Sequence, residues 1–193
     1  LGQESCGEPG SLRPELERLA TEVVPAYASV DGSLTGALLG PLAEVPAVLA
    51  HRDLGSWNVA IDGDDFTVLD WESAARPSVP LWDTAYLLAD AASAVDGPAA
   101  AERKVERIAE VFSGRHRLSG WTFERLRRAA AALGVPEDAI GPAVVTGWLH
   151  HGRSTAARAA RAEHRTVTEG LMERVAARWL EDPALGPGWA PPT

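Results

Sequence analysis

The sequence has almost none of the residues that build covalent or metal cross-links, because Cys6 is its only cysteine. A single cysteine excludes an intramolecular disulfide and a cysteine-based zinc site, and it favours a reducing cytoplasm as the compartment. Long apolar runs are also missing, and no positively charged, apolar leader opens the sequence. We therefore expect neither a membrane-spanning helix nor export.

Basic residues are the minority charge: 18 lysine and arginine side chains stand against 27 acidic ones, for a formal net charge of −9. Nucleic-acid binding would need a concentrated basic face, so no nucleic-acid partner is expected. The acidity is compatible with a cationic substrate, although solubility explains such a charge in most acidic proteins. Lysine is scarcer still, because Lys104 is the only one.

The remaining composition is that of an ordinary globular protein, with 46% hydrophobic and 23% charged residues. One domain is the usual outcome for a chain of 193 residues, and folding at this length buries roughly 70% of the unfolded surface. We expect a single domain over residues 1–193. Its polar or Pro- and Gly-rich ends, 1–10 and 182–193, are expected to be loose.

Apolar residues recur every three or four positions over much of the chain, which predicts amphipathic helices. The first covers residues 12–27, with Ser11 as its N-cap. The segment 31–44 fits either an irregular connector or a second short helix. Gly134 and Pro136 mark the end of one later helix and the start of the next. The later helices are predicted, in chain order, at 81–94, 101–112, 121–133, 139–161 and 167–180.

Two short apolar runs in the first half of the chain predict a β-hairpin. Residues 58–61 and 66–71 are rich in β-branched and apolar side chains, and the turn-forming residues 62–65 separate them. A third extended segment is expected at 45–50, just before His51. The hairpin brings its two open ends to one edge. Strands do not alternate with helices, so we predict a mostly helical α+β fold and not a doubly wound sheet.

The polar residues at this edge follow a fixed spacing. His51 is followed by Asp53, by Asn58 five residues later, and by Asp70 at the end of the second hairpin strand. An Asp followed five residues later by an Asn is the pattern of the kinase catalytic loop. Phosphoryl transfer depends on positioning a hydroxyl and neutralising phosphate charge with Mg²⁺, and Mg²⁺ prefers hard oxygen ligands. Carboxylate and amide oxygens at this edge meet that need.

The residues after the hairpin distinguish among the families that share this loop pattern. Asp70 begins the sequence Asp-Trp-Glu, and Asp83 ends the sequence Pro-Leu-Trp-Asp that comes soon after the hairpin. In both respects the chain resembles the aminoglycoside phosphotransferase and choline kinase-like family, which has a protein-kinase-like fold. Protein kinases would show Asp-Phe-Gly and a downstream Ala-Pro-Glu, which are absent. The resemblance covers residues 45–95 well and the helical remainder loosely.

The resemblance implies roles for the residues that match the family's motif. Asp53 is the expected catalytic base or hydroxyl-orienting residue, and Asn58 and Asp70 are the expected magnesium ligands. Asp83 resembles the family's helix-borne Asp that braces the catalytic loop. Glu72 would touch a metal-bound water or pair with an arginine, and we favour the pairing. His51 is expected to be a packed, hydrogen-bonded structural residue.

Some other aromatic and histidine residues are expected to be structural, and two positions in the loop differ from the family's usual residues. Trp71 and Trp82 are expected to belong to the core. His150 and His151 are adjacent on a helix and lack the four-residue spacing of zinc helices. Family members usually have glycine where this chain has Arg52, and often a small residue or proline where it has Trp57.

The phosphate-binding half of a kinase is not found before the motif. A kinase needs a Gly-rich loop and a strand-borne lysine upstream of its catalytic loop, and the 50 residues before His51 hold no lysine. The resemblance therefore implies the C-terminal, substrate-side lobe alone, with the N-terminal ATP-clamping lobe absent and supplied by the same or another chain. Alone, this lobe would have weak activity or none.

Three functions remain open from the sequence. The first is ATP- and Mg-dependent phosphorylation of a hydroxyl on a small molecule, an aminoglycoside, choline-like amine, sugar or macrolide among the candidates. The second is a non-catalytic kinase-like binding or scaffold lobe, or a degenerate remnant. The third, a metal-dependent hydrolase using His51, Asp53 and Asp70, is disfavoured because the other histidines lie far along the chain.

Overall fold

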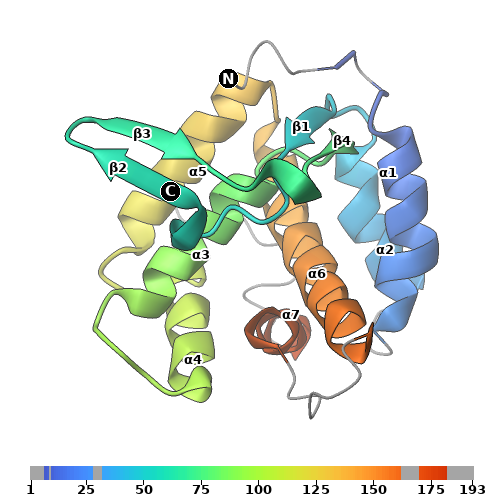
Figure 1. Ribbon diagram of the computed structural model, residues 1–193. Helices are drawn as coiled ribbons and strands as arrows, with labels where there is room; N and C mark the ends of the chain where they lie inside the picture. Colours follow the sequence, from blue (N-terminus) through green and yellow to red (C-terminus); the bar gives the residue numbers. More distant parts are fainter. Residues whose placement is uncertain (1–6, 9, 28–31, 162–169, 182–193) are drawn as a thin grey trace.

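The computed structural model describes residues 7, 8, 10–27, 32–161 and 170–181 (Figure 1). The expected loose end 182–193 and most of 1–10 lie outside these residues. The helices are α1 (Arg13–Arg18), α2 (Gly32–Leu39), α3 (Trp82–Ala94), α4 (Ala101–Phe112), α5 (Ser119–Leu133), α6 (Glu137–Arg161) and α7 (Leu171–Glu181). The strands are β1 (Val48–Ala50), β2 (Val59–Asp62), β3 (Asp65–Val68) and β4 (Ala75–Ser78). The predicted α+β class with mostly helical content is confirmed.

The core is helical and rich in aromatic rings. Helix α6 runs through the middle of the molecule, with α1 and α2 on one side and α3 to α5 on the other (Figure 1). Trp148 of α6 meets Trp179 of α7 edge-on, with ring centroids 4.7 Å apart, and Phe112 of α4 completes the cluster. In the described residues, no helix is both long enough and apolar enough to cross a membrane.

The first helix is shorter than its apolar pattern predicts. The predicted 12–27 helix is regular only over α1, continues as a π-helical turn at Leu19–Val23, and ends in a 3₁₀ turn at Val24–Ala26 that contains Pro25. Ser11 does not cap it, which corrects the prediction. Its Oγ instead accepts a hydrogen bond from the backbone N–H of Ala47 at 3.0 Å, and this bond connects the start of α1 to the chain just before β1.

The segment 31–44, which fitted either a connector or a helix, forms α2 and a 3₁₀ turn at Gly40–Leu42. The later helices lie close to their predicted positions. Helix α4 has the predicted bounds, and α5 and α6 each begin two residues earlier than predicted. Gly134 adopts the left-handed conformation at the end of α5, with φ of 68°, as a C-terminal glycine should. The predicted start of the last helix, 167–169, lies outside the described residues.

The strands form two small antiparallel sheets. Strands β2 and β3 make the predicted hairpin, with Val59 opposite Val68 and Asp62 opposite Asp65, and Gly63 turns the chain with φ of 61°. Strand β1 pairs with β4, which the sequence did not predict. The sequence of β4, Ala-Arg-Pro-Ser, carries a proline and no run of β-branched residues, so its pairing depends on partners 25 and 30 residues away.

Candidate active site

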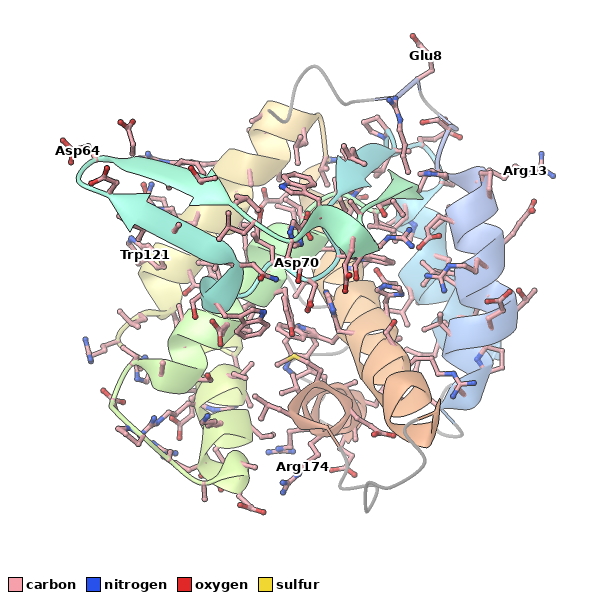
Figure 2. All side chains as sticks on the ribbon, viewed as in Figure 1. Glu8, Arg13, Asp64, Asp70, Trp121 and Arg174 are labelled. Atoms are coloured by element: carbon pink, nitrogen blue, oxygen red, sulfur yellow. The ribbon has the colours of Figure 1, made fainter. Side chains whose placement is uncertain are left out.

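The polar residues that the motif singled out lie where the hairpin meets the helical body. Figure 2 shows Asp70 at this junction near the middle of the view, and Asp64 at the opposite, free end of the hairpin. The loop 51–58 runs from the end of β1 to the start of β2 and therefore reaches the same junction. Its conformation is held by side chains that bond to backbone atoms.

Asp83, in the first turn of α3, holds the beginning of the loop. Its Oδ2 accepts the backbone N–H of His51 at 2.6 Å, and its Oδ1 accepts the backbone N–H of Arg52 at 2.8 Å. Burial raises the pKa of the Asp83 carboxyl, and the two N–H donors offset this only in part. A helix residue thus fixes the path of the chain immediately before Asp53.

His51 connects the loop to the end of the hairpin. Its ring is 1% exposed, its Nε2 lies 2.7 Å from the carbonyl oxygen of Leu69, and its Nδ1 lies 3.3 Å from the backbone N–H of Asp53. These contacts fit one tautomer, in which Nε2–H donates to Leu69 and Nδ1 accepts from Asp53. The ring therefore joins the residue before Asp70 to Asp53 itself.

Asn58 closes the loop on itself. Its side-chain Nδ2 donates to the backbone oxygen of Asp53 at 2.9 Å, and its own backbone oxygen accepts the N–H of Leu69 at 2.9 Å. Because the amide nitrogen is used inside the loop, the amide oxygen of this buried side chain is the atom that remains to face a cation. It lies in a 3₁₀ turn just before β2, where a strand start was predicted.

Asp70 lies just beyond β3 in a left-handed conformation, with φ of 58° and ψ of 61°. Aspartate is one of the few residues other than glycine that visit this region often. The strand β3 ends at Val68, three residues before the predicted end at 71, and the turn Trp71–Ser73 follows Asp70 at once. Asp70 is exposed, and its backbone stays near Asn58 because the neighbouring Leu69 is bonded to both His51 and Asn58.

Arg52 is the residue whose role the sequence did not reveal. It also has a left-handed backbone, with φ of 64°, which explains why glycine is usual here in the family that the motif resembles. Its Nε donates to Ser78 Oγ at 2.6 Å and its Nη2 to the carbonyl oxygen of Pro77 at 3.0 Å. The guanidinium also lies over the ring of Trp82, 5.7 Å from its centroid.

A buried carboxylate of α1 completes the surroundings of Arg52. Glu15 is 5% exposed, and its Oε1 lies 3.0 Å from Arg52 Nη2 and 2.8 Å from Arg18 Nη2. Arg18 in turn lies 2.9 Å from Nδ1 of His150, whose ring stacks on Trp82. Burial lowers the pKa of Arg52, while the hydrogen bond to Glu15 raises that of Arg18. The only sequence signal for this network was an arginine in place of glycine.

Trp57, the second departure from the family, covers the loop from outside. Its indole ring packs over Gly55, where a methyl group would collide with it, and meets Tyr86 edge-on at 6.0 Å. Gly55 is thus required by close approach and not by its backbone angles, since its φ is −95°. The bulky residue at position 57 is accommodated because the loop has no side chain beneath it.

Some predictions for the other residues near the motif are confirmed and others are wrong. Trp82 is 1% exposed and belongs to the core, as predicted, but Trp71 is 44% exposed, so its prediction as a core residue is wrong. It stands edge-on to His51 and donates its Nε1–H to the carbonyl of Val68. Glu72 is exposed, and no arginine among the described residues pairs with it.

The two adjacent histidines of α6 stack on aromatic rings of α3. The ring of His151 stacks on Tyr86, with centroids 4.0 Å apart, and the ring of His150 stacks on Trp82.

The donor set fits a hard cation. Asp53, Asn58 and Asp70 offer two carboxylates and an amide oxygen from a loop and an adjoining strand end, which suits Mg²⁺. Within the part of the chain that the structure describes, no three His, Cys, Asp or Glu side chains gather as a metal site, and the set above has only two such side chains because its third donor is an amide. A hydrolytic metal centre that recruits His51 is not supported either, because both its ring nitrogens contact the backbone.

Comparison with known proteins agrees with this chemistry. A sequence model of the phosphotransferase enzyme family matches residues 7–121, which include α1, both sheets and every residue of the candidate site. No curated protein and no solved structure matches the chain. The match covers more than half of the sequence, so the chain belongs to the phosphotransferase enzyme family.

Proposed function

We propose that this chain is the C-terminal, substrate-side lobe of a kinase-like fold that transfers a phosphoryl group from ATP to a hydroxyl group of a small molecule, as aminoglycoside phosphotransferases do. The observation that supports it most is the pair of connections from Asp53 to the hairpin. Its backbone oxygen is bonded to Asn58, and its backbone N–H is bonded to His51, which also holds Leu69 beside Asp70.

Each residue has a distinct role in the proposed reaction. Asp53 orients the substrate hydroxyl and accepts its proton as the oxygen attacks the γ-phosphorus and the bond to the departing ADP breaks. Asn58 and Asp70 would hold Mg²⁺ through their side-chain oxygens, which neutralises charge on the phosphates. His51 and Asp83 hold these groups in position, since a misplacement of about 1 Å can cost a factor of about 100 in rate.

The proposal includes a partner lobe that clamps ATP, in the same or another polypeptide. Leu69 and Trp71, the two neighbours of Asp70 in the sequence, are 47% and 44% exposed, so large apolar side chains flank this residue of the candidate site. Patches of exposed apolar side chains commonly mark contact surfaces. The excess of acidic residues makes a substrate with a positive charge reasonable as well.

The experiment measures phosphoryl transfer from ATP to a panel of hydroxyl-bearing amines, sugars and macrolides, using the chain together with an ATP-binding lobe. Asp53→Asn and Asp70→Asn are expected to lower the transfer rate by a factor of about 100 or more. Asp138→Asn, at an exposed position in the first turn of α6, is the matched control and should leave the rate unchanged. Transfer that survives both site variants would exclude the proposed roles.

Metal binding gives a second readout that needs no partner lobe. Mn²⁺, used as a paramagnetic substitute for Mg²⁺, should broaden the NMR signals of residues near Asn58 and Asp70, and Asp70→Asn should remove the broadening. If Mn²⁺ binds in this way but no acceptor is ever phosphorylated, the non-catalytic binding lobe becomes the better description.

A further inference from the structure

A second concave surface lies on one face of the β2–β3 hairpin, away from the candidate active site. It encloses about 380 Å³, within the range of small binding sites in proteins. Apolar side chains form most of it, and two carboxylates lie at one end. The lining residues are Leu54, Val59, Ile61, Asp64, Asp65, Phe66, Val68 and Leu87, and we call this surface the hairpin groove.

The hairpin register explains why the groove is apolar. Val59 lies opposite Val68 and Ile61 opposite Phe66, so these four side chains share one face of the two-stranded sheet. Leu54 from the loop and Leu87 from α3 form the facing wall. The other face of the hairpin carries Ala60 and Thr67 and, next to the turn, Asp62 and Asp65, so Asp65 borders the groove only at its end. Asp53, Asn58 and Asp70 do not line the groove, so it is distinct from the candidate active site.

The apolar side chains of the groove are unusually open to solvent. Ile61 is 75% exposed and Phe66 is 68% exposed, the highest values among the large hydrophobic residues of the described chain. A pair of strands with only one cross-strand neighbour each also leaves two sheet edges unpaired in the described residues. Contiguous exposed apolar surface of this kind usually marks a site of interaction.

The charge at the end of the groove limits what can occupy it. Asp64 and Asp65 line the groove and Asp62 adjoins them, and none of the three forms an ion pair within the described residues. Figure 2 shows Asp64 at the free end of the hairpin, far from the helical body. An occupant that fills the apolar part and reaches this end gains most if it carries a positive charge there.

We propose that the hairpin groove binds a short segment of a partner polypeptide that combines apolar side chains with a lysine or arginine. The apolar side chains lie between the hairpin and Leu54 and Leu87, and the basic side chain pairs with Asp64 at the turn, where Asp65 adds to the negative charge. A second copy of this chain fits less well, because a net charge of −9 would bring acidic surfaces together. The exposure of Ile61 and Phe66 leaves the groove accessible from solvent, so a segment of another chain can reach it.

The test is an NMR titration of the methyl groups of the whole chain with a synthetic peptide of alternating leucine and arginine. Shifts at Val59, Ile61, Val68 and Leu87 are expected, with little change elsewhere. A peptide with glutamate in place of arginine should bind at least about tenfold more weakly, which corresponds to about 1.4 kcal/mol. Equal binding of the two peptides, or no shift at these methyl groups, would overturn the proposal.

Variants locate the interaction. Ile61→Ser and the double variant Asp64→Asn with Asp65→Asn should each weaken binding about tenfold or more, and all three positions are exposed, so the fold should tolerate the changes. Leu49→Ser, an exposed leucine on β1 outside the groove, is the matched control and should bind like the wild type. Self-association that Ile61→Ser abolishes would assign the groove to a second copy and overturn the peptide proposal. The peptide titration does not measure phosphoryl transfer, so its result is independent of whether the proposed function is correct.

Discussion

Arg52 Nη2 lies 3.0 Å from Glu15 Oε1, so a carboxylate of α1 is joined to the loop that carries Asp53. The two side chains are 16% and 5% exposed, and Arg52 has a left-handed backbone conformation, which is strained for a residue with a side chain. Strain of this kind persists only where surrounding contacts hold the residue in place. The pair therefore makes α1 a support of the candidate active site, although α1 lies more than 30 residues before it.

A double-mutant cycle measures this support. Glu15→Gln should lower the free energy of unfolding by about 3 kcal/mol, because it leaves a buried guanidinium without its counter-charge. Arg52→Gly removes that guanidinium and also the backbone strain, so the double variant should lose less than the sum, with a coupling of about 0.5–3 kcal/mol. Urea unfolding followed by tryptophan fluorescence gives these values.

The exposed pair Arg13 and Glu17 on the same helix is the matched control for the cycle. Its side chains are 82% and 64% exposed, so Glu17→Gln should change the free energy of unfolding by less than about 1 kcal/mol. Strict additivity of Glu15→Gln and Arg52→Gly would show that the pair is not a support of the loop.

His51→Phe tests the connection between the loop and the hairpin. The aromatic packing against Trp71 is kept, but the carbonyl of Leu69 and the N–H of Asp53 lose their partner, at a cost of about 1–3 kcal/mol each. Hydrogen exchange at the Asp53 amide should become faster, and Mn²⁺ binding should weaken. His51→Gln, which keeps a donor and an acceptor, is expected to restore part of both. Unchanged exchange at Asp53 would contradict the connection.

Two substitutions at Asp70 distinguish the effect of backbone strain from the effect of metal binding. Asp70→Ala should destabilise the protein by about 1–2 kcal/mol, since alanine is disfavoured in the left-handed region. Asp70→Asn tolerates that region and should keep the stability within about 0.5 kcal/mol, while Mn²⁺ binding falls as strongly as in the alanine variant. Thermal unfolding and Mn²⁺ titration on the same samples distinguish the two effects. Equal stability of both variants would argue against strain at this position.

Asp83 should give the stability a recognisable pH dependence. Burial raises its folded-state pKa above the ordinary 3.8, so between these values the folded state binds more protons than the unfolded state. The contribution of Asp83 to the free energy of unfolding is therefore complete below pH 3.8. It is lost as the pH rises through the raised folded-state pKa. The measurement is the difference in unfolding free energy between wild type and Asp83→Asn across this range.

Asp96 serves as the control of opposite sign. The hydrogen bond from Arg117 lowers its folded-state pKa, so its contribution to stability is present above 3.8 and is lost as pH falls through the lowered value. The difference between wild type and Asp96→Asn should thus decrease at low pH. Because Asp96 lies at the surface, salt should weaken its effect but not that of Asp83. Slopes of the same sign for both would contradict the burial of Asp83.

The sequence predicted most of what depends on neighbours along the chain. The helix α4 was placed at its observed bounds because its apolar stripe is regular, and the hairpin was predicted because a turn sequence separates two apolar runs. The loop residues His51, Asp53 and Asn58 were found through their spacing. Each of these signals is contained within about 20 residues.

What the sequence did not reveal depends on partners far along the chain. Strand β4 exists because β1 pairs with it, and its own sequence resembles a loop. The break in the first helix and the bond from Ser11 to Ala47 are likewise set by tertiary contacts. Nothing in the sequence indicated the role of Glu15, which depends on its burial against Arg52, 37 positions further along the chain.

The hydrogen bonds that shape the loop share a property with consequences for its evolution. Those from His51, Asn58 and Asp83 all end on backbone atoms, and so does one from Arg52. Every residue type except proline presents the same N–H and C=O groups. Positions such as Leu69 are therefore free to change their side chains, and with them the surface next to Asp70, without disturbing the geometry of the loop. The loop can therefore keep one geometry while the surface around it varies.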